Sequence, residues 1–215
     1  MGKNLRIYAT LALGIGAFAI YALGANVWLP TYLQRVHGFT PGESGRFLGV
    51  SVFLFGILGS VTAGWLADTL ARRGYRDGLS RIGIAYAIGM LLCGGIGPIV
   101  SIHWLSLSLV SLSGFFSLTW AGVNVSVLQT ITPIRMRSQV SAIYLLFTNI
   151  VGMGFGPTMI AAATDYLFKR DDAVGYSLAL VAAGSMTLTC LILWIGRREI
   201  ARRFTPLNIV EPLAQ

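Results

Sequence analysis

Charged residues are scarce in this sequence. Asp, Glu, Lys and Arg make up 11% of its 215 residues, against roughly 25% in an average soluble protein. Only eight residues are acidic, whereas 55% are hydrophobic and the mean hydropathy is +0.72. This composition excludes an ordinary soluble domain and indicates an all-α protein that crosses a membrane several times.

Cysteine and histidine are also rare, with two residues of each. Cys93 and Cys190 lie within apolar runs, where we expect small buried side chains rather than a disulfide framework, a metal site or a cofactor site. His37 and His103 fall in predicted loops, where we expect solvated side chains rather than pH sensors. The basic residues lie in short loops between apolar runs, so the net charge of +8 does not indicate binding to nucleic acid.

Long intervals without charge define the predicted membrane spans, which must be helical because unpaired backbone groups are costly in lipid. The interval between Arg46 and Asp68 is long enough for one span of about 20 residues. The longer interval from Arg81 to Arg135 holds two spans, separated by the glycine- and proline-rich break at residues 94–98. Six spans are predicted in a domain of residues 1–203, at about 7–29, 47–67, 82–100, 104–128, 139–163 and 176–196, with a cytoplasmic tail at 204–215.

Lys and Arg are distributed unequally between the two sides of this six-helix bundle, twelve against four, so the positive-inside rule places both termini in the cytoplasm. The twelve are Lys3, Arg6, Arg72, Arg73, Arg76, Arg81, Arg135, Arg137, Arg197, Arg198, Arg202 and Arg203, and the four are Arg35, Arg46, Lys169 and Arg170. Lys3 and Arg6 before an apolar run also resemble a signal peptide, but the many further spans favour a membrane helix.

The first and fourth spans carry polar and aromatic residues three or four positions apart, and therefore on one helical face. Polar side chains are costly in lipid unless they face a partner or a wet cavity. We therefore predict a cavity lined by Tyr21, Trp28, Ser113, Ser117, Trp120 and Asn124, with Asn26 close by. The alternative is that the serines bond to carbonyls of their own helix and the aromatic residues belong to the membrane-interface belt.

The second and fifth spans are rich in small residues four positions apart, a spacing that lets helices approach closely. The pairs are Gly45 and Gly49, Ser60 and Gly64, and Gly152 and Gly156, the last followed by Pro157. The run from Gly152 to Pro157 is similar to a nucleotide-binding loop only superficially, because no strand precedes it and no acid follows at the required position.

The segment from Gly64 to Arg73 resembles the loop signature of the major facilitator superfamily, in which a glycine, an acid and then basic residues join the second and third spans of a six-span half. Thr69 stands where a basic residue is usual and Ala71 where glycine is usual, as in the weaker copy of the second half. Residues resembling the penultimate span of that half are Pro133, Arg135, Arg137, Asn149, Gly152, Gly156, Pro157 and Asp165. The stretch 29–38, leading to residues 43–45, is more narrowly similar to spinster-like members, described as transporters of lipids or organic anions.

The resemblance implies a secondary transporter that moves a small organic or lipid-like solute by alternating access between two related halves. The first and fourth helices of a half then line the cavity, the second and fifth pack against the other half, and the third and sixth face lipid. The half-half packing residues are expected to be Gly45, Gly49, Ser60, Gly152, Gly156 and Pro157. The second half would be the chain's own amino-terminal half, a partner chain or a second copy of this chain. We favour the first alternative, in which the amino-terminal half has been lost by truncation.

The resemblance also implies a cytoplasmic gate made of Gly64, Asp68, Arg72, Arg73, Arg135 and Arg137. Asp68 would accept a hydrogen bond or a charge from Arg135 or Arg137 and so hold the cytoplasmic side closed in the outward-open state. The alternative is a solvated loop acid beside loop arginines, worth about 0–1 kcal/mol.

Two other functions are alternatives to transport. An intramembrane serine protease is disfavoured, because Ser111 replaces the first glycine of a nucleophile turn at Ser113 and no histidine follows to act as a base. A non-transporting scaffold stays open. We therefore predict no enzyme, but a multi-pass protein of a bacterial inner membrane, whose partners are lipid, a small-molecule substrate and a second six-span half.

Overall fold

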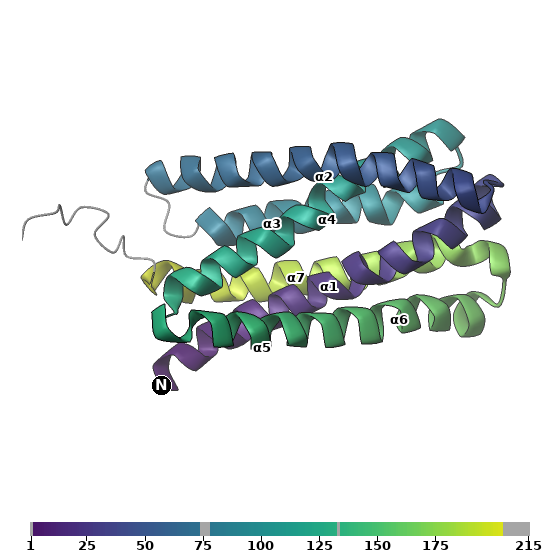
Figure 1. The fold of residues 1–215 in the computed structure, drawn as a ribbon. Helices are drawn as coiled ribbons and strands as arrows, with labels where there is room; N and C mark the ends of the chain where they lie inside the picture. The colour runs from purple at the N-terminus through teal and green to yellow at the C-terminus, as the bar shows by residue number, and fades with distance from the viewer. Residues whose placement is uncertain (1, 74–77, 133, 204–215) are drawn as a thin grey trace, which may run out of the picture.

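The computed structural model describes residues 2–73, 78–132 and 134–203, and within them the side chains of 2–7, 71, 79, 118–131 and 198–203 lie outside the described set. All secondary structure in the described ranges is helical and forms six antiparallel rods (Figure 1). The first, second and fourth rods are α1 (Gly2–His37), α2 (Pro41–Arg72) and α4 (His103–Ile131).

The other three rods each combine several helical pieces. The third is α3 (Gly78–Met90), a π-helical turn (Leu91–Ile96) and a 3-10 turn (Gly97–Ile99). The fifth is a 3-10 turn (Ile134–Met136), α5 (Arg137–Asn149), a π turn (Ile150–Phe155), α6 (Gly156–Ala162) and a second π turn (Ala163–Phe168). The sixth is a 3-10 turn (Asp171–Ala173) followed by α7 (Val174–Arg203).

Five helical segments of the described residues are long and apolar enough to cross a membrane: Tyr8–His37, Pro41–Leu70, Ser80–Ile99, Ile134–Phe168 and Asp171–Arg197. The predicted span at 104–128 falls within α4, part of which lies outside the described side chains. The chain is therefore an all-helical protein with the elements of a multi-pass membrane protein. The count of six spans and the sidedness of the termini stay predictions.

Local sequence explains where the first two helices end and begin. Gly38 has φ 71° after the last residue of α1, a left-handed conformation that glycine adopts without strain, and the Phe39 N–H donates to the Leu33 carbonyl at 3.2 Å. Thr40 and Glu43 then form a reciprocal capping box, with the Thr40 N–H donating to Glu43 Oε2 at 2.8 Å and the Glu43 N–H donating to Thr40 Oγ1 at 3.3 Å. The connection between α1 and α2 is therefore short and fixed in direction.

Proline accounts for one π turn in the third rod and for the first of the two π turns in the fifth rod. Pro98 and Pro157 each lack an N–H and would clash with the carbonyl four residues earlier, so the helix preceding each one widens into a π turn. The break expected at residues 94–98 coincides with the end of the third rod, before α4 begins at His103.

The rods form two groups. In the first, α1 packs on α7 and on the fifth rod; in the second, α2 packs on α4 beside α3, and α3 joins the groups by packing on α7 (Figure 1). The core lies around α1 and α7 and includes Phe18, Tyr21, Tyr32, Leu178 and Met186, each at most 2% exposed. The interior of the bundle is therefore already filled by the chain's own side chains.

The second and fifth rods bury little of their surface within the chain. Only 22% of the most apolar stretch of α2 and 17% of that of the fifth rod is buried, against 61% for α1. Their exposed side chains are large and apolar, for example Phe53, Val61, Ile143 and Leu146, each at least 61% exposed. Faces of this kind require lipid or another apolar surface to cover them.

Candidate functional site

The predicted gate residues lie at one end of the bundle, which we call the arginine end and define by Arg72, Arg73 and Arg135. A hollow of about 370 Å³ there is lined by Trp65, Asp68, Thr69 and Arg72 from the last turns of α2 and by Arg73, which follows the helix. Asp68 and Arg72 are exposed and four residues apart, which places them on one face of the helix. The hollow combines one carboxylate with two guanidinium groups and so carries net positive charge.

The start of the fifth rod supplies the other gate residues. Arg135 and Arg137 are both exposed, and Arg137 Nε donates to the Thr132 carbonyl at 3.1 Å, which ties the start of α5 to the end of α4. Among the described side chains, Asp68 makes no ion pair with either arginine in this conformation. The contact between Asp68 and these arginines that would close the cytoplasmic gate stays a proposal for another conformation of the chain.

The aromatic residues of α1 are turned toward the chain's own interior. The Tyr21 hydroxyl, 1% exposed, donates to the Gly94 carbonyl, and Trp28 Nε1 donates to the Pro157 carbonyl at 3.0 Å. These bonds tie α1 to the third and fifth rods. Of the three α1 residues expected in the cavity, Asn26 is exposed, Trp28 is half-buried and Tyr21 lies inside the bundle.

Two of the four cavity candidates on α4, Ser113 and Ser117, have described side chains. Ser113 is buried and its Oγ donates to the Val110 carbonyl of the same helix at 2.6 Å, as the alternative interpretation of the serines expects. Ser117 is half-buried. The side chains of Trp120 and Asn124 lie outside the described residues.

The small residues of the fifth rod pack against α1 within the chain, and their packing against another half stays a prediction. A Cβ on Gly156 would overlap the Ile20 carbonyl oxygen and lie 3.0 Å from Gly24 Cα, and one on Gly152 would lie 2.9 Å from the Ala19 carbonyl oxygen. The physical reason is that α1 and the fifth rod approach at backbone distance, which only glycine permits. Pro157 lies beside them, half-buried, and its carbonyl accepts the Trp28 bond.

The small residues of α2 are free of such contacts. Nothing lies within 4 Å of a Cβ built on Gly45, Gly49 or Gly64. Ser60 is exposed and its Oγ donates to the Gly56 carbonyl of its own helix at 2.9 Å. The strip of α2 defined by Gly45, Gly49 and Ser60 is therefore open to an external partner, and we call it the α2 strip.

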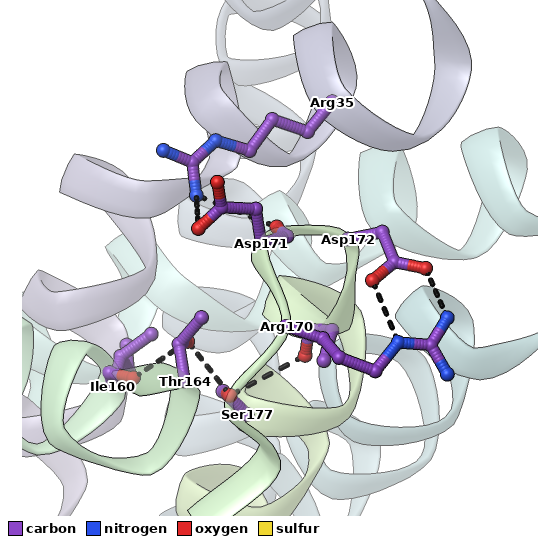
Figure 2. A network of polar contacts seen from close by, with 8 residues as sticks. Arg35, Ile160, Thr164, Arg170, Asp171, Asp172 and Ser177 are labelled. Atoms are coloured by element: carbon purple, nitrogen blue, oxygen red, sulfur yellow. Dashed lines mark hydrogen bonds and ion pairs between the residues drawn. The ribbon is translucent and has the colours of Figure 1, made fainter. Parts of the chain in front are cut away.

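The opposite end of the bundle, which we call the histidine end and define by His37, His103 and Asp171, holds polar contacts that sequence reasoning missed. Arg35, near the end of α1, lies 3.7 Å from Asp171 in an exposed ion pair, and Arg170 Nε donates to Asp172 at 3.0 Å (Figure 2). Beneath them, the buried Thr164 hydroxyl donates to Ser177 Oγ at 2.8 Å, linking the fifth rod to α7 (Figure 2).

The two histidines meet at this end. Their Nδ1 atoms lie 2.8 Å apart, and His37 Nε2 lies 2.9 Å from the Tyr32 hydroxyl, which in turn lies 2.8 Å from Ser106 Oγ. The only sequence signal for this contact is that both histidines fall in loops on the same predicted side. Within the described ranges, no three His, Cys, Asp or Glu side chains gather as a metal site would require.

Comparison with known proteins defines the class. No protein-family model matches the chain. It is 26% identical over 204 residues to an MFS-type efflux pump of Mycolicibacterium smegmatis, covering 92% of this chain and 47% of that protein. It is 27% identical to the uncharacterized transporter YybO of Bacillus subtilis, covering 78% and 38%, and 26% identical to a D-galactonate transporter of Escherichia coli, covering 75% and 35%.

Solved structures agree on the fold. A bacterial homolog of the human lysosomal transporter Spinster, inward-facing and unoccupied, matches with a TM-score of 0.62 at 16% identity, over 92% of this chain and 48% of that one. Its occupied form matches with a TM-score of 0.58. The chain is thus related to the MFS-type transporters, and it has the fold of one half of such a transporter. It spans less than half the length of each relative it matches here.

Proposed function

We propose that the chain acts as the carboxyl-terminal half of a secondary transporter and moves a small organic or lipid-like solute across a bacterial inner membrane by alternating access. The observation that carries the proposal is the match of nearly the whole chain to half of a Spinster-type transporter. Relatives named as transporters rather than enzymes support it further. The name of the D-galactonate transporter gives a substrate whereas that of the efflux pump gives none, so the comparisons favour no single solute.

The exposed faces of the bundle support the need for a second half. No atoms lie within 4 Å of a Cβ built on Gly45 or Gly49 of the α2 strip, whereas Gly152 and Gly156 of the fifth rod pack against α1. A second six-span half would cover the α2 strip and close the solute cavity against the exposed Asn26 and the half-buried Ser117. The runner-up function is a non-transporting scaffold, in which the strip would be covered by lipid alone.

Photo-crosslinking in the membrane tests this proposal. A photoreactive amino acid replaces Gly49 on the α2 strip, and a matched control replaces Ile195 on α7, which is 77% exposed. In cells that express the chain from its own locus, we expect position 49 to crosslink to a protein, either a partner half or a second copy, and position 195 to crosslink to lipid. Crosslinking of both positions to lipid alone would contradict the transporter-half proposal and favour the scaffold or a fragment.

A further inference from the structure

The contact between His37 and His103 joins two elements that are 66 residues apart in sequence, the last residue of α1 and the first residue of α4. Their ring centroids are 4.6 Å apart, and the Phe39 and Trp104 rings pack around them at 5.6–6.3 Å. His37 is half-buried and His103 is exposed. One ring is therefore held within the fold while the other remains open to the surrounding solution.

The hydrogen-bond chain fixes how many protons the pair can hold. Two Nδ1 atoms 2.8 Å apart can share only one proton, since one nitrogen must donate and the other must accept. The Tyr32 hydroxyl has one proton and three neighbouring acceptors, which are Ser106 Oγ at 2.8 Å, His37 Nε2 at 2.9 Å and the Pro98 carbonyl at 3.3 Å. Whichever Nδ1 atom carries the shared proton, the other accepts it, and the contact can form between two neutral rings.

One additional proton fits this arrangement, but two do not. With one, a single proton still lies between the Nδ1 atoms and both Nε2 atoms carry hydrogen, so the contact persists with one positive charge. With two, both Nδ1 atoms carry hydrogen, and two donors with like charge face each other at 2.8 Å. The rings must then separate. The state with separated rings binds the second proton more readily, so the contact is lost as the pH falls.

The other charged groups near the histidine pair either interact with residues outside the pair or are exposed. On α1, Arg35 pairs with Asp171 of the loop before α7. On α2, Glu43 accepts hydrogen bonds from Thr40, and Arg46 is exposed. Among the described residues, the titratable groups in polar contact with the His37 ring are Tyr32 of α1 and His103 of α4. Among the described side chains, no carboxylate is hydrogen-bonded to the pair to stabilise a second positive charge.

We propose that His37 and His103 form a proton-controlled latch that holds the end of α1 against the start of α4 and opens when the pair binds a second extra proton. The latch lies at the histidine end, away from the arginine end and its gate. It depends on the two rings and on the buried Tyr32–Ser106 pair.

Nitrogen-15 NMR of the full 215-residue chain in lipid nanodiscs, labelled at histidine and kept in EDTA to exclude metals, tests the latch. Because the chain has two histidines, His37→Gln and His103→Gln each assign the other ring. At pH 8 we expect a scalar coupling between the two Nδ1 nuclei. We expect the pair to titrate in two steps more than about one pH unit apart, with the coupling lost at the second step. In either variant the remaining histidine titrates in one step.

A second readout follows the opening itself. Spin labels on cysteines replacing Val36 and Leu105, both exposed beside the latch, report the distance between α1 and α4. We expect this distance to lengthen with the second protonation step, and to stay constant with pH in the matched His37→Gln/His103→Gln double variant. Independent one-step titration of both wild-type histidines, or a coupling that persists through full protonation, would overturn the proposal. Because the wild-type spectrum alone decides between these outcomes, the test remains valid even if a variant fails to fold.

Discussion

Replacement of Gly156 by alanine tests the close packing of α1 against the fifth rod. A methyl group there would overlap the Ile20 carbonyl oxygen and lie 3.0 Å from Gly24 Cα. Both obstacles are backbone atoms, which cannot rotate away as a flexible side chain can. Overpacking of this kind typically costs 1–3 kcal/mol, and we expect about 3 kcal/mol because the helices themselves must separate. This corresponds to a folding equilibrium constant roughly a hundredfold smaller.

Gly154→Ala is the matched control, because it makes the same change two residues away on the same rod. Nothing lies within 4 Å of a Cβ at Gly154, and alanine is favoured over glycine in helices by roughly 0.5–1 kcal/mol. Reversible unfolding of the chain in mixed micelles, followed by tryptophan fluorescence, measures both variants. We expect Gly154→Ala to be at least as stable as the wild type. If Gly156→Ala were equally stable, the intrachain packing of these helices would be refuted.

Four further outcomes are expected. Tyr21→Phe removes the bond to the Gly94 carbonyl and should destabilise the chain by about 1 kcal/mol in the same unfolding assay. Arg35→Gln, which breaks an exposed ion pair, should change stability by less than about 1 kcal/mol. Gly49→Leu should leave the unfolding of the isolated chain unchanged within about 1 kcal/mol while weakening capture of its partner half in a pull-down from membranes. Asp68→Asn, but not Asp68→Glu, should shift the assembled transporter toward its inward-open state, seen as faster maleimide labelling of a cysteine at Met136.

Hydropathy predicted the all-helical character of the chain, and turn chemistry predicted the break that ends the third rod. An uncharged apolar interval leaves the backbone no option but a helix in lipid, and the break at residues 94–98 contains the glycines and proline that end the third rod. The capping box at Thr40 and Glu43 is likewise encoded by adjacent residues. Features that depend on nearest neighbours along the chain are therefore readable in advance.

Which helices meet was harder to predict. Gly45 with Gly49 and Gly152 with Gly156 share the same spacing, yet the first pair faces open space and the second pair packs against α1. Spacing indicates that a close approach is allowed but carries no information about the partner. The same holds for Tyr21, whose helical face was predicted but whose hydroxyl turns inward to Gly94. The His37–His103 contact depends on how α1 and α4 end in space, which no local pattern records.

Labelling of single cysteines in intact cells tests the proposed transporter-half topology most directly. In a Cys93→Ala/Cys190→Ala background, one cysteine replaces Ile102 at the histidine end and another replaces Arg73 at the arginine end, both exposed positions. We predict that a membrane-impermeant maleimide labels position 102 from outside the inner membrane and labels position 73 only after lysis. Labelling of both positions from the same side, or of position 73 alone from outside, would contradict a membrane-spanning half with its arginine gate in the cytoplasm.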